Sequence, residues 1–159
     1  MNSHSLLFLD MALRFESLMR QGPAYRNWSQ KKLFDNLAWY WNRGLVAFFL
    51  DSSGVAHGLC LIRLFRRIEQ MFDYSVHDPC GEFLFIDLLV ADEPNAMADC
   101  FEQFFARFGP QKIVIWDRGD RTEEGCPRMY RWDQFLRLAY KLTYGLINEK
   151  GDLYGIQWR

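Results

Sequence analysis

The chain has 159 residues, enough for one domain with a sizeable buried core, and its 14 Phe, 7 Tyr and 6 Trp argue against a disordered chain. A net charge of -1 excludes a general attraction to nucleic acid or to an anionic membrane. We find no signal peptide, no membrane-spanning stretch and no CxxC pair, and therefore expect one soluble, cytoplasmic domain over residues 1–159 with no metal or disulfide framework.

Two helices are expected first. Apolar residues recur at helical spacing from about Ser5 to Arg20, and Gln21-Gly22-Pro23 ends that pattern. Ser29 is a good N-cap for a second helix that ends near Arg43. The expected buried positions are Leu7, Met11, Phe15 and Leu18, widened by Leu6, Leu9 and Leu13, in the first helix, and Leu33, Phe34, Leu37, Tyr40 and Trp41 in the second.

A hairpin follows, with strands over Leu45–Leu50 and Val55–Phe65. Strict alternation in the second strand sets His57 among apolar neighbours, where it is either a satisfied histidine at the rim of the core or a catalyst. We expect residues 66–80 to form an irregular excursion at the end of the sheet. The alternation predicts Val55, His57, Leu59, Leu61 and Arg63 on one face, and Ala56, Gly58, Cys60 and Ile62 on the other.

The clearest strand is Phe83–Val90, an apolar run interrupted by a single charged residue, Asp87. Such a run is typical of a central strand that is covered on both faces. A carboxylate in that position is costly unless it is paired, hydrogen-bonded or protonated. Asp87 is therefore either a structural residue that accepts local hydrogen bonds or a group retained for chemistry.

The second half predicts a helix over Asn95–Phe108, with Asp92 as its N-cap, and a buried strand over Lys112–Asp117 that is parallel to the central strand. A further helix is expected over Pro127–Ala139. The order predicts an α/β fold of the α+β type, with one mixed, mostly antiparallel sheet flanked by helices. Two last strands are expected over Tyr140–Ile147 and Leu153–Trp158.

This order of elements resembles the N-acetyltransferase-like (GNAT) acyltransferase fold. In that fold a glycine-rich loop between the central strand and the following helix binds the cofactor's pyrophosphate through backbone N–H groups. Here the corresponding residues are Ala91-Asp92-Glu93-Pro94-Asn95, with no glycine and two acids. The acids repel a phosphate, so the resemblance implies acyl carrier protein as the donor more readily than acyl-CoA, and no tightly bound cofactor.

Two motifs give a closer resemblance, to the toxin-activating lysine acyltransferases of the haemolysin-activating type. That family carries Pro-x-His-Arg-Asn-Trp early in the chain, and this sequence has Pro23-Ala24-Tyr25-Arg26-Asn27-Trp28. Its central strand carries Phe-Ile-Asp, and this sequence has Phe85-Ile86-Asp87. The resemblance covers roughly residues 5–117. It implies transfer of an acyl group from acyl carrier protein to a lysine or another amine.

The resemblance places the family's catalytic dyad on Tyr25 and Asp87, so the histidine of the pair is a tyrosine here. A phenol with a pKa near 10 does not replace an imidazole as a base. We therefore expect Asp87 to act as base or to orient the amine, with Tyr25 donating a hydrogen bond. His57 is expected to supply an imidazole if strand pairing brings it near Asp87.

Arg26, Arg63 and Trp28 are the expected substrate-binding residues, since an arginine can hold an anionic acyl donor. The loss of the phosphate loop and of the histidine favours a second hypothesis, a catalytically inactive binding or interaction protein of the same fold. Its surplus aromatic residues can form a contact surface, and an uncovered strand edge near Trp158 suggests a homodimer. A tunnel to Asp87 favours the enzyme, whereas a filled core around it favours the binding protein.

Overall fold

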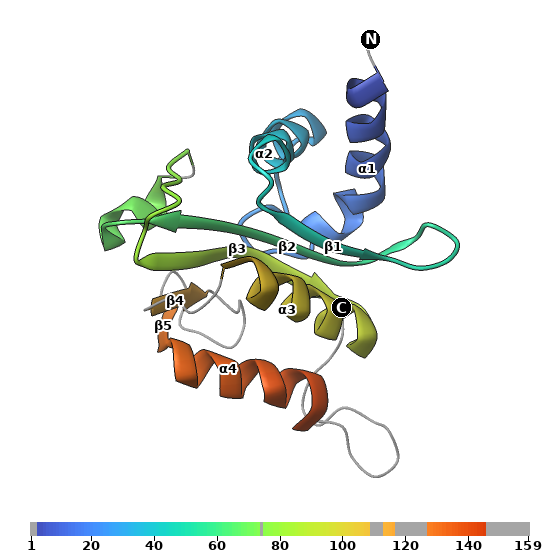
Figure 1. Cartoon of the computed structure of the whole chain (residues 1–159). Coiled ribbons are helices and arrows are strands. Elements are labelled where there is room, and N and C mark those ends of the chain that lie inside the picture. Colours follow the sequence, from blue (N-terminus) through green and yellow to red (C-terminus); the bar gives the residue numbers. More distant parts are fainter. Residues whose placement is uncertain (1–2, 74, 109–112, 117–126, 146–159) are drawn as a thin grey trace.

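A computed structural model describes residues 3–73, 75–108, 113–116 and 127–145 (Figure 1). It contains a five-stranded sheet in the order β1-β2-β3-β4-β5. Only β3 and β4 pair in parallel, while the other neighbouring pairs are antiparallel. The predicted mixed, mostly antiparallel α+β sheet is therefore confirmed. The strands are β1 (Val46–Leu50), β2 (Ala56–Phe65), β3 (Phe83–Ala91), β4 (Ile113–Trp116) and β5 (Arg128–Arg131).

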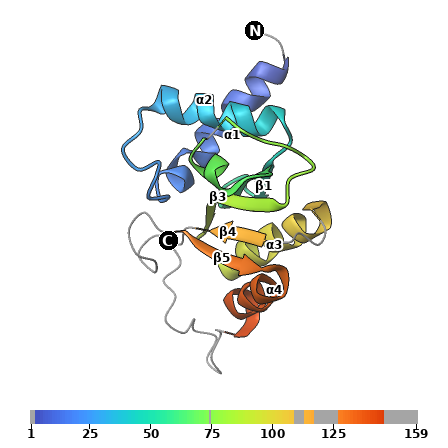
Figure 2. The same ribbon diagram turned by 90° about the vertical axis from the view of Figure 1, so that its left-hand side faces the viewer.

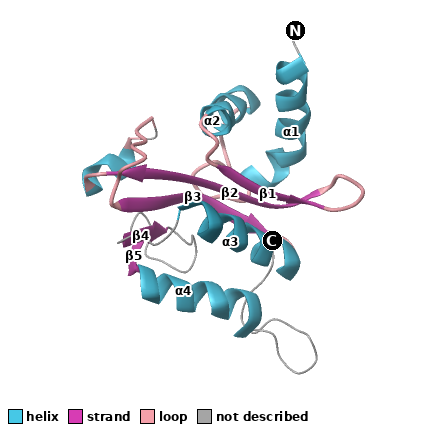
Figure 3. Cartoon of the chain, viewed as in Figure 1, coloured by secondary structure: helices cyan, strands magenta, loops and turns pink. Residues whose placement is uncertain are grey.

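Helices cover both faces of this sheet, with α1 (Ser3–Met19) and α2 (Gln30–Asn42) on one side and α3 (Pro94–Phe108) and α4 (Trp132–Tyr140) on the other. Figure 2 shows these two helix layers above and below the strands, and Figure 3 separates helices from strands by colour. Each layer has its own core cluster, because alternate strand residues point to opposite faces. No helix in the described residues is long and apolar enough to cross a membrane.

The predicted apolar face of the first helix is partly wrong. Met11, Phe15 and Leu18 are buried as expected. The helix packs through a narrower stripe than the sequence suggests, because its contacts with β2, β3 and α2 cover only part of its apolar face. Ser29 caps α2 as predicted, with its hydroxyl accepting from the Lys32 backbone at 3.2 Å. The exposed leucines of α1 are Leu6 (56%), Leu7 (54%), Leu9 (39%) and Leu13 (56%).

Two breaks in register change which residues share a face. Between β1 and β2, Phe49 pairs with Gly58 and Leu50 with Ala56, so His57 has no partner on β1. Ala56 consequently packs in the α1/α2 core, on the opposite face of the sheet from the one that strict alternation predicts. Bulges of this kind are invisible to a period-two pattern, since one extra residue shifts every side chain beyond it to the other face.

The C-terminal predictions are only partly right. Residues 128–131 form the short strand β5 rather than the start of a helix, because they pair with β4. Lys141–Gly145 continues α4 as a π-helical turn, so the strand predicted from Tyr140 is wrong over these residues. The last predicted strand, Leu153–Trp158, and the dimer edge assigned to it lie outside the described residues.

The segment between β2 and β3 is irregular as predicted, with one short 3-10 helix, η1 (Ile68–Phe72). In Figure 1 it lies at the end of the sheet, on the same side as α2. Gly81 closes it, because a Cβ there would come within 2.5 Å of backbone atoms of Phe65. The returning chain can therefore pack directly on β2 only with glycine at this position.

Candidate functional site

Asp87 stands at the second break in register, between β2 and β3. Leu61 pairs with Leu88 and Ile62 with Ile86, which leaves Asp87 as the extra residue of β3. Its side chain points to the α1/α2 side, where it meets α2. The parallel pairing of β3 with β4 is described as far as Ile86, which pairs with Trp116, the last described residue of β4.

Two buried side chains bind one oxygen of this carboxylate. The Tyr40 hydroxyl donates a hydrogen bond to Asp87 Oδ2, and Arg63 Nε donates to the same oxygen at 3.0 Å. The side chains of Arg63 and Asp87 are both 0% exposed. The other oxygen, Oδ1, is buried and has no hydrogen-bond partner among the described residues. We call Asp87, Arg63 and Tyr40 the buried cluster.

Burial controls the protonation chemistry of the buried cluster. Loss of solvent raises the pKa of Asp87 to about 6, although Arg63 and the Tyr40 hydrogen bond both favour the charged form. Burial likewise raises the pKa of Tyr40 well above its ordinary value, and the Asp87 charge adds to that effect. Tyr40 therefore remains a hydrogen-bond donor, while Asp87 changes charge near neutral pH.

Tyr25, assigned by resemblance, lies next to this cluster. Its side chain is fully buried in the same core as Tyr40, and its charge state affects the pKa of Tyr40. Its ring packs edge-on against Trp28, with centroids 4.8 Å apart. Trp28 also lies under the Lys32 ammonium at 4.0 Å. The structure thus places Tyr25 in the same core as Tyr40, the hydrogen-bond partner of Asp87, whereas Arg26 is exposed.

Arg63 has a different environment from the one expected of a donor-binding residue. Its guanidinium is enclosed and donates to Asp87 and to backbone carbonyls of the segment between β2 and β3. In this arrangement it faces the protein interior. The sequence contained a signal for this, because Arg63 falls within an otherwise apolar strand next to Asp87's strand, but only the bulge aligns the two side chains.

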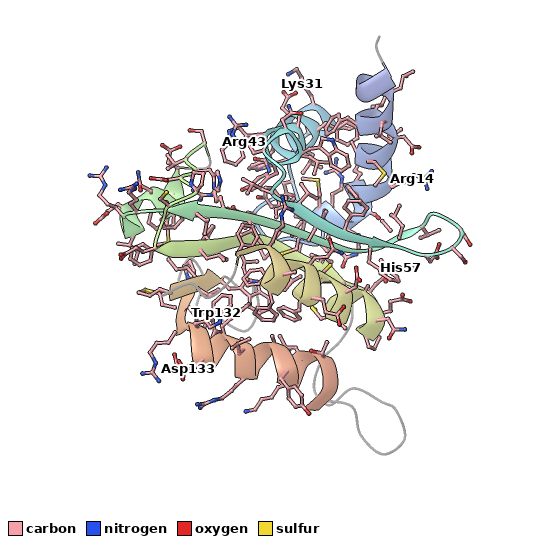
Figure 4. All side chains as sticks on the ribbon, viewed as in Figure 1. Arg14, Lys31, Arg43, His57, Trp132 and Asp133 are labelled. Carbon is pink, nitrogen blue, oxygen red and sulfur yellow. The ribbon has the colours of Figure 1, made fainter. Side chains whose placement is uncertain are left out.

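His57 is not brought to Asp87. It lies at the hairpin end of β2 (Figure 4), where its backbone oxygen accepts from the Asp92 amide at 2.9 Å. Asp92 is five residues along the chain from Asp87, a separation of about 16 Å in a strand. The His57 ring lies between two carboxylates, with Nε2 2.8 Å from Asp51 Oδ2 and Nδ1 2.8 Å from Asp92 Oδ1. We call these three residues the surface cluster.

Two members of the surface cluster, together with the neighbouring Glu93, form the one group in the described part of the chain that could hold a metal. His57, Asp92 and Glu93 each place one ligand atom within 4.8 Å of the others. Both ring nitrogens of His57 already face carboxylates, however, so a protonated imidazole accounts for the geometry without an ion. The hydrogen bond with Asp51 and then that with Asp92 raise the pKa of His57, which favours this charged form. The Asp92 side chain therefore binds His57, and α3 begins two residues after it, at Pro94.

Tyr40 is the site residue that sequence reasoning missed as a functional group. Its position on the apolar stripe of α2 marked it only as a core residue. The available signal was its hydroxyl, because a buried tyrosine needs a polar partner and Asp87 was the unpaired polar residue of the core.

No model of a known protein family matches this sequence, and no curated protein matches it significantly. The arrangement of the buried cluster must therefore carry the functional argument.

Proposed function

We propose that the protein is an acyltransferase that moves an acyl group from acyl carrier protein, rather than from acyl-CoA, to an amine such as a protein lysine. The observation that carries this proposal is Asp87. It is a buried carboxylate with one oxygen that has no hydrogen-bond partner among the described residues, and burial raises its pKa to about 6. A buried carboxylate with a shifted pKa is a candidate for proton transfer.

The partly exposed backbone of β3 supports an extended donor. The backbone of Asp87 is partly exposed even though its side chain is not. Strand edges bind extended, amide-containing chains through backbone hydrogen bonds, as the pantetheine arm of an acyl carrier would require. At the end of this strand, Asp92 and Glu93 disfavour the phosphates of a free coenzyme.

The proposed chemistry uses Oδ1 of Asp87 as the base. The amine nitrogen attacks the thioester carbonyl, and Oδ1 accepts the proton that the nitrogen loses. The carbon–sulfur bond then breaks, the amide forms, and the proton passes to the leaving thiolate. A pKa of about 6 suits a base that works near neutral pH. Tyr25 is assigned to donate a hydrogen bond to the carbonyl oxygen as negative charge develops on it.

Mass spectrometry tests this proposal directly. The protein is incubated with acyl carrier protein loaded with short and long acyl chains, or with the matching acyl-CoA, and with lysine-containing peptides. We expect acylated peptide from the carrier-bound donor, and a loss of at least about 100-fold in rate for Asp87→Asn. Asp35→Asn is the matched control, because Asp35 forms an exposed pair with Lys31. Undiminished transfer by Asp87→Asn would remove Asp87 from catalysis.

A second function is favoured by the enclosure of the site. The side chains of Asp87, Arg63 and Tyr25 are fully buried, which matches the filled core expected of an inactive binding protein. In that case the cluster would serve folding, and the exposed apolar residues of α1 would contact a partner. Absence of transfer from every donor, with Asp87→Asn impaired only in stability, would select this alternative.

A further inference from the structure

Arg63, the ion-pair partner of Asp87, also binds a segment outside the regular sheet. The chain leaves β2 after Phe65 and returns to pair Phe83 with it. Between these points, residues 66–73 include η1 and lack strand pairing. We call residues 66–73 the lid segment.

One side chain holds most of the lid segment. Arg63 Nη1 donates to the backbone oxygens of Gln70 at 2.9 Å and Asp73 at 2.7 Å, and Nη2 donates to that of Met71. Through Nε the same guanidinium binds the Asp87 carboxylate. Arg63 is thus the direct link between the lid segment and the proposed base. Beyond the lid segment, Nη1 also lies 3.4 Å from the Val76 oxygen.

The remaining support of the lid segment is a small apolar contact and an ion pair at the surface between Arg66 and Asp78. Ile68 and Met71 pack against the cluster formed by Phe65, Phe85 and Ile115. Both lid residues are only partly buried, and Phe72 at the end of η1 is 70% exposed. Tyr40, on the other side of Asp87, belongs to the large α1/α2 core. By contrast, none of residues 66–73 is buried.

We propose that residues 66–73 are a lid over Asp87 that Arg63 holds closed. This inference rests on the proposed function, since an acyl acceptor cannot reach a side chain that is 0% exposed. Opening transfers the lid carbonyls to water, which costs little because water replaces each lost hydrogen bond. It exposes the Arg63 side of the carboxylate while β2 and β3 remain paired. Segments with few buried contacts are the ones that open locally in folded proteins.

The lid can be loosened without changing the proposed base. Met71→Ala removes part of the apolar contact and leaves Arg63 and Asp87 intact. Hydrogen exchange of the full chain is expected to rise about tenfold for the lid amides, with β2 and β3 amides unchanged. Phe72→Ala, at the exposed neighbouring position, is the matched control and is expected to leave exchange unchanged. Arg63→Met should open the lid further.

A second readout reports on Asp87 itself. Carbodiimide coupling of carboxyl groups to glycine ethyl ester, mapped by mass spectrometry, should label Asp87 more in Met71→Ala than in the wild type or Phe72→Ala. If the lid amides exchange only together with the amides of β2 and β3, the segment does not open independently and the lid proposal is wrong. Faster lid exchange without more labelling of Asp87 would also overturn it. If Met71→Ala shows both faster lid exchange and more labelling of Asp87, but the protein transfers no acyl group, the lid proposal stands and the proposed function is refuted.

Discussion

The buried cluster and the surface cluster use the same kind of pairing at different degrees of solvent exposure. Each joins an aspartate to a basic side chain beside a break in strand register, at Asp87 in one and at His57 in the other. Asp87 and Arg63 are 0% exposed, whereas His57 is 21% and Asp51 33% exposed. Burial raises the pKa of Asp87, but the His57 hydrogen bond lowers that of Asp51. Solvent access, rather than pairing, decides the sign of the shift.

This difference separates their roles. A partly exposed carboxylate that stays charged can hold the hairpin turn against the start of α3, through His57 and Asp92. A carboxylate that changes charge near neutral pH can accept a proton, as the proposed transfer requires. At each site a bulge explains why one side chain, Asp87 in the buried cluster and His57 in the surface cluster, departs from the regular alternation of its strand.

Removing Arg63 should cause the largest loss of stability, because Arg63 is the charged partner in the buried cluster. Arg63→Met leaves the buried Asp87 carboxylate without its charged partner, so we expect a loss of about 3–5 kcal/mol in the free energy of unfolding. Urea denaturation measures it. Arg66→Met is the control, because Arg66 pairs with Asp78 at the surface and should change stability little. Equal losses in the two variants would contradict the contrast.

Stability should depend on pH through Asp87. Its folded pKa, about 6, is above the usual 3.8, so the folded state binds the proton more tightly. The stabilisation that this tighter proton binding gives the folded state is complete below about pH 4. It is lost as pH rises through 6, a change of about 3 kcal/mol in the free energy of unfolding. Asp87→Asn cannot titrate. The difference in unfolding free energy, wild type minus Asp87→Asn, should therefore fall between pH 4 and 7, and a rising difference would refute the raised pKa.

Tyr40→Phe should have a smaller effect. It removes one donor to Asp87 Oδ2 but leaves Arg63 in place, so we expect a loss of about 1–2 kcal/mol. Because the lost hydrogen bond favours the charged carboxylate, the pKa of Asp87 should rise further. Thermal denaturation over a pH series measures both. The same substitution in Asp87→Asn should cost less, and an undiminished cost would mean that Tyr40 acts elsewhere.

The smallest effect is expected at the surface cluster. The folded pKa of His57 is raised above 6.5, so its stabilisation is present below pH 6.5 and is lost as pH rises through the raised value. NMR titration of the imidazole should show this, and Asp51→Asn should bring the pKa back toward 6.5. His77 is an internal control, because burial lowers its pKa. A His57 pKa below 6.5 would contradict the arrangement.

The fold was largely predictable because its strongest patterns are local. The apolar run around Asp87, the helical spacing of Met97 and Phe104, and the cap at Ser29 each predict an element that the structure contains. The strand β5 was missed because four residues with two arginines carry little periodic signal. The leucines of α1 were misplaced because the spacing of apolar residues predicts a stripe but not how much of it a neighbour covers.

The site was less predictable than the fold. Alternation and apolar composition were enough to identify Asp87 as a buried charge in a central strand. Its partners depended on one unpaired residue in the register of β2 and β3 and on the packing of α2 against that face, which bring Arg63 and Tyr40 to a single oxygen. The same kind of break sent His57 to Asp51 and Asp92 instead. Sequence patterns report period and composition, whereas register and solvent access arise only when distant segments pack together.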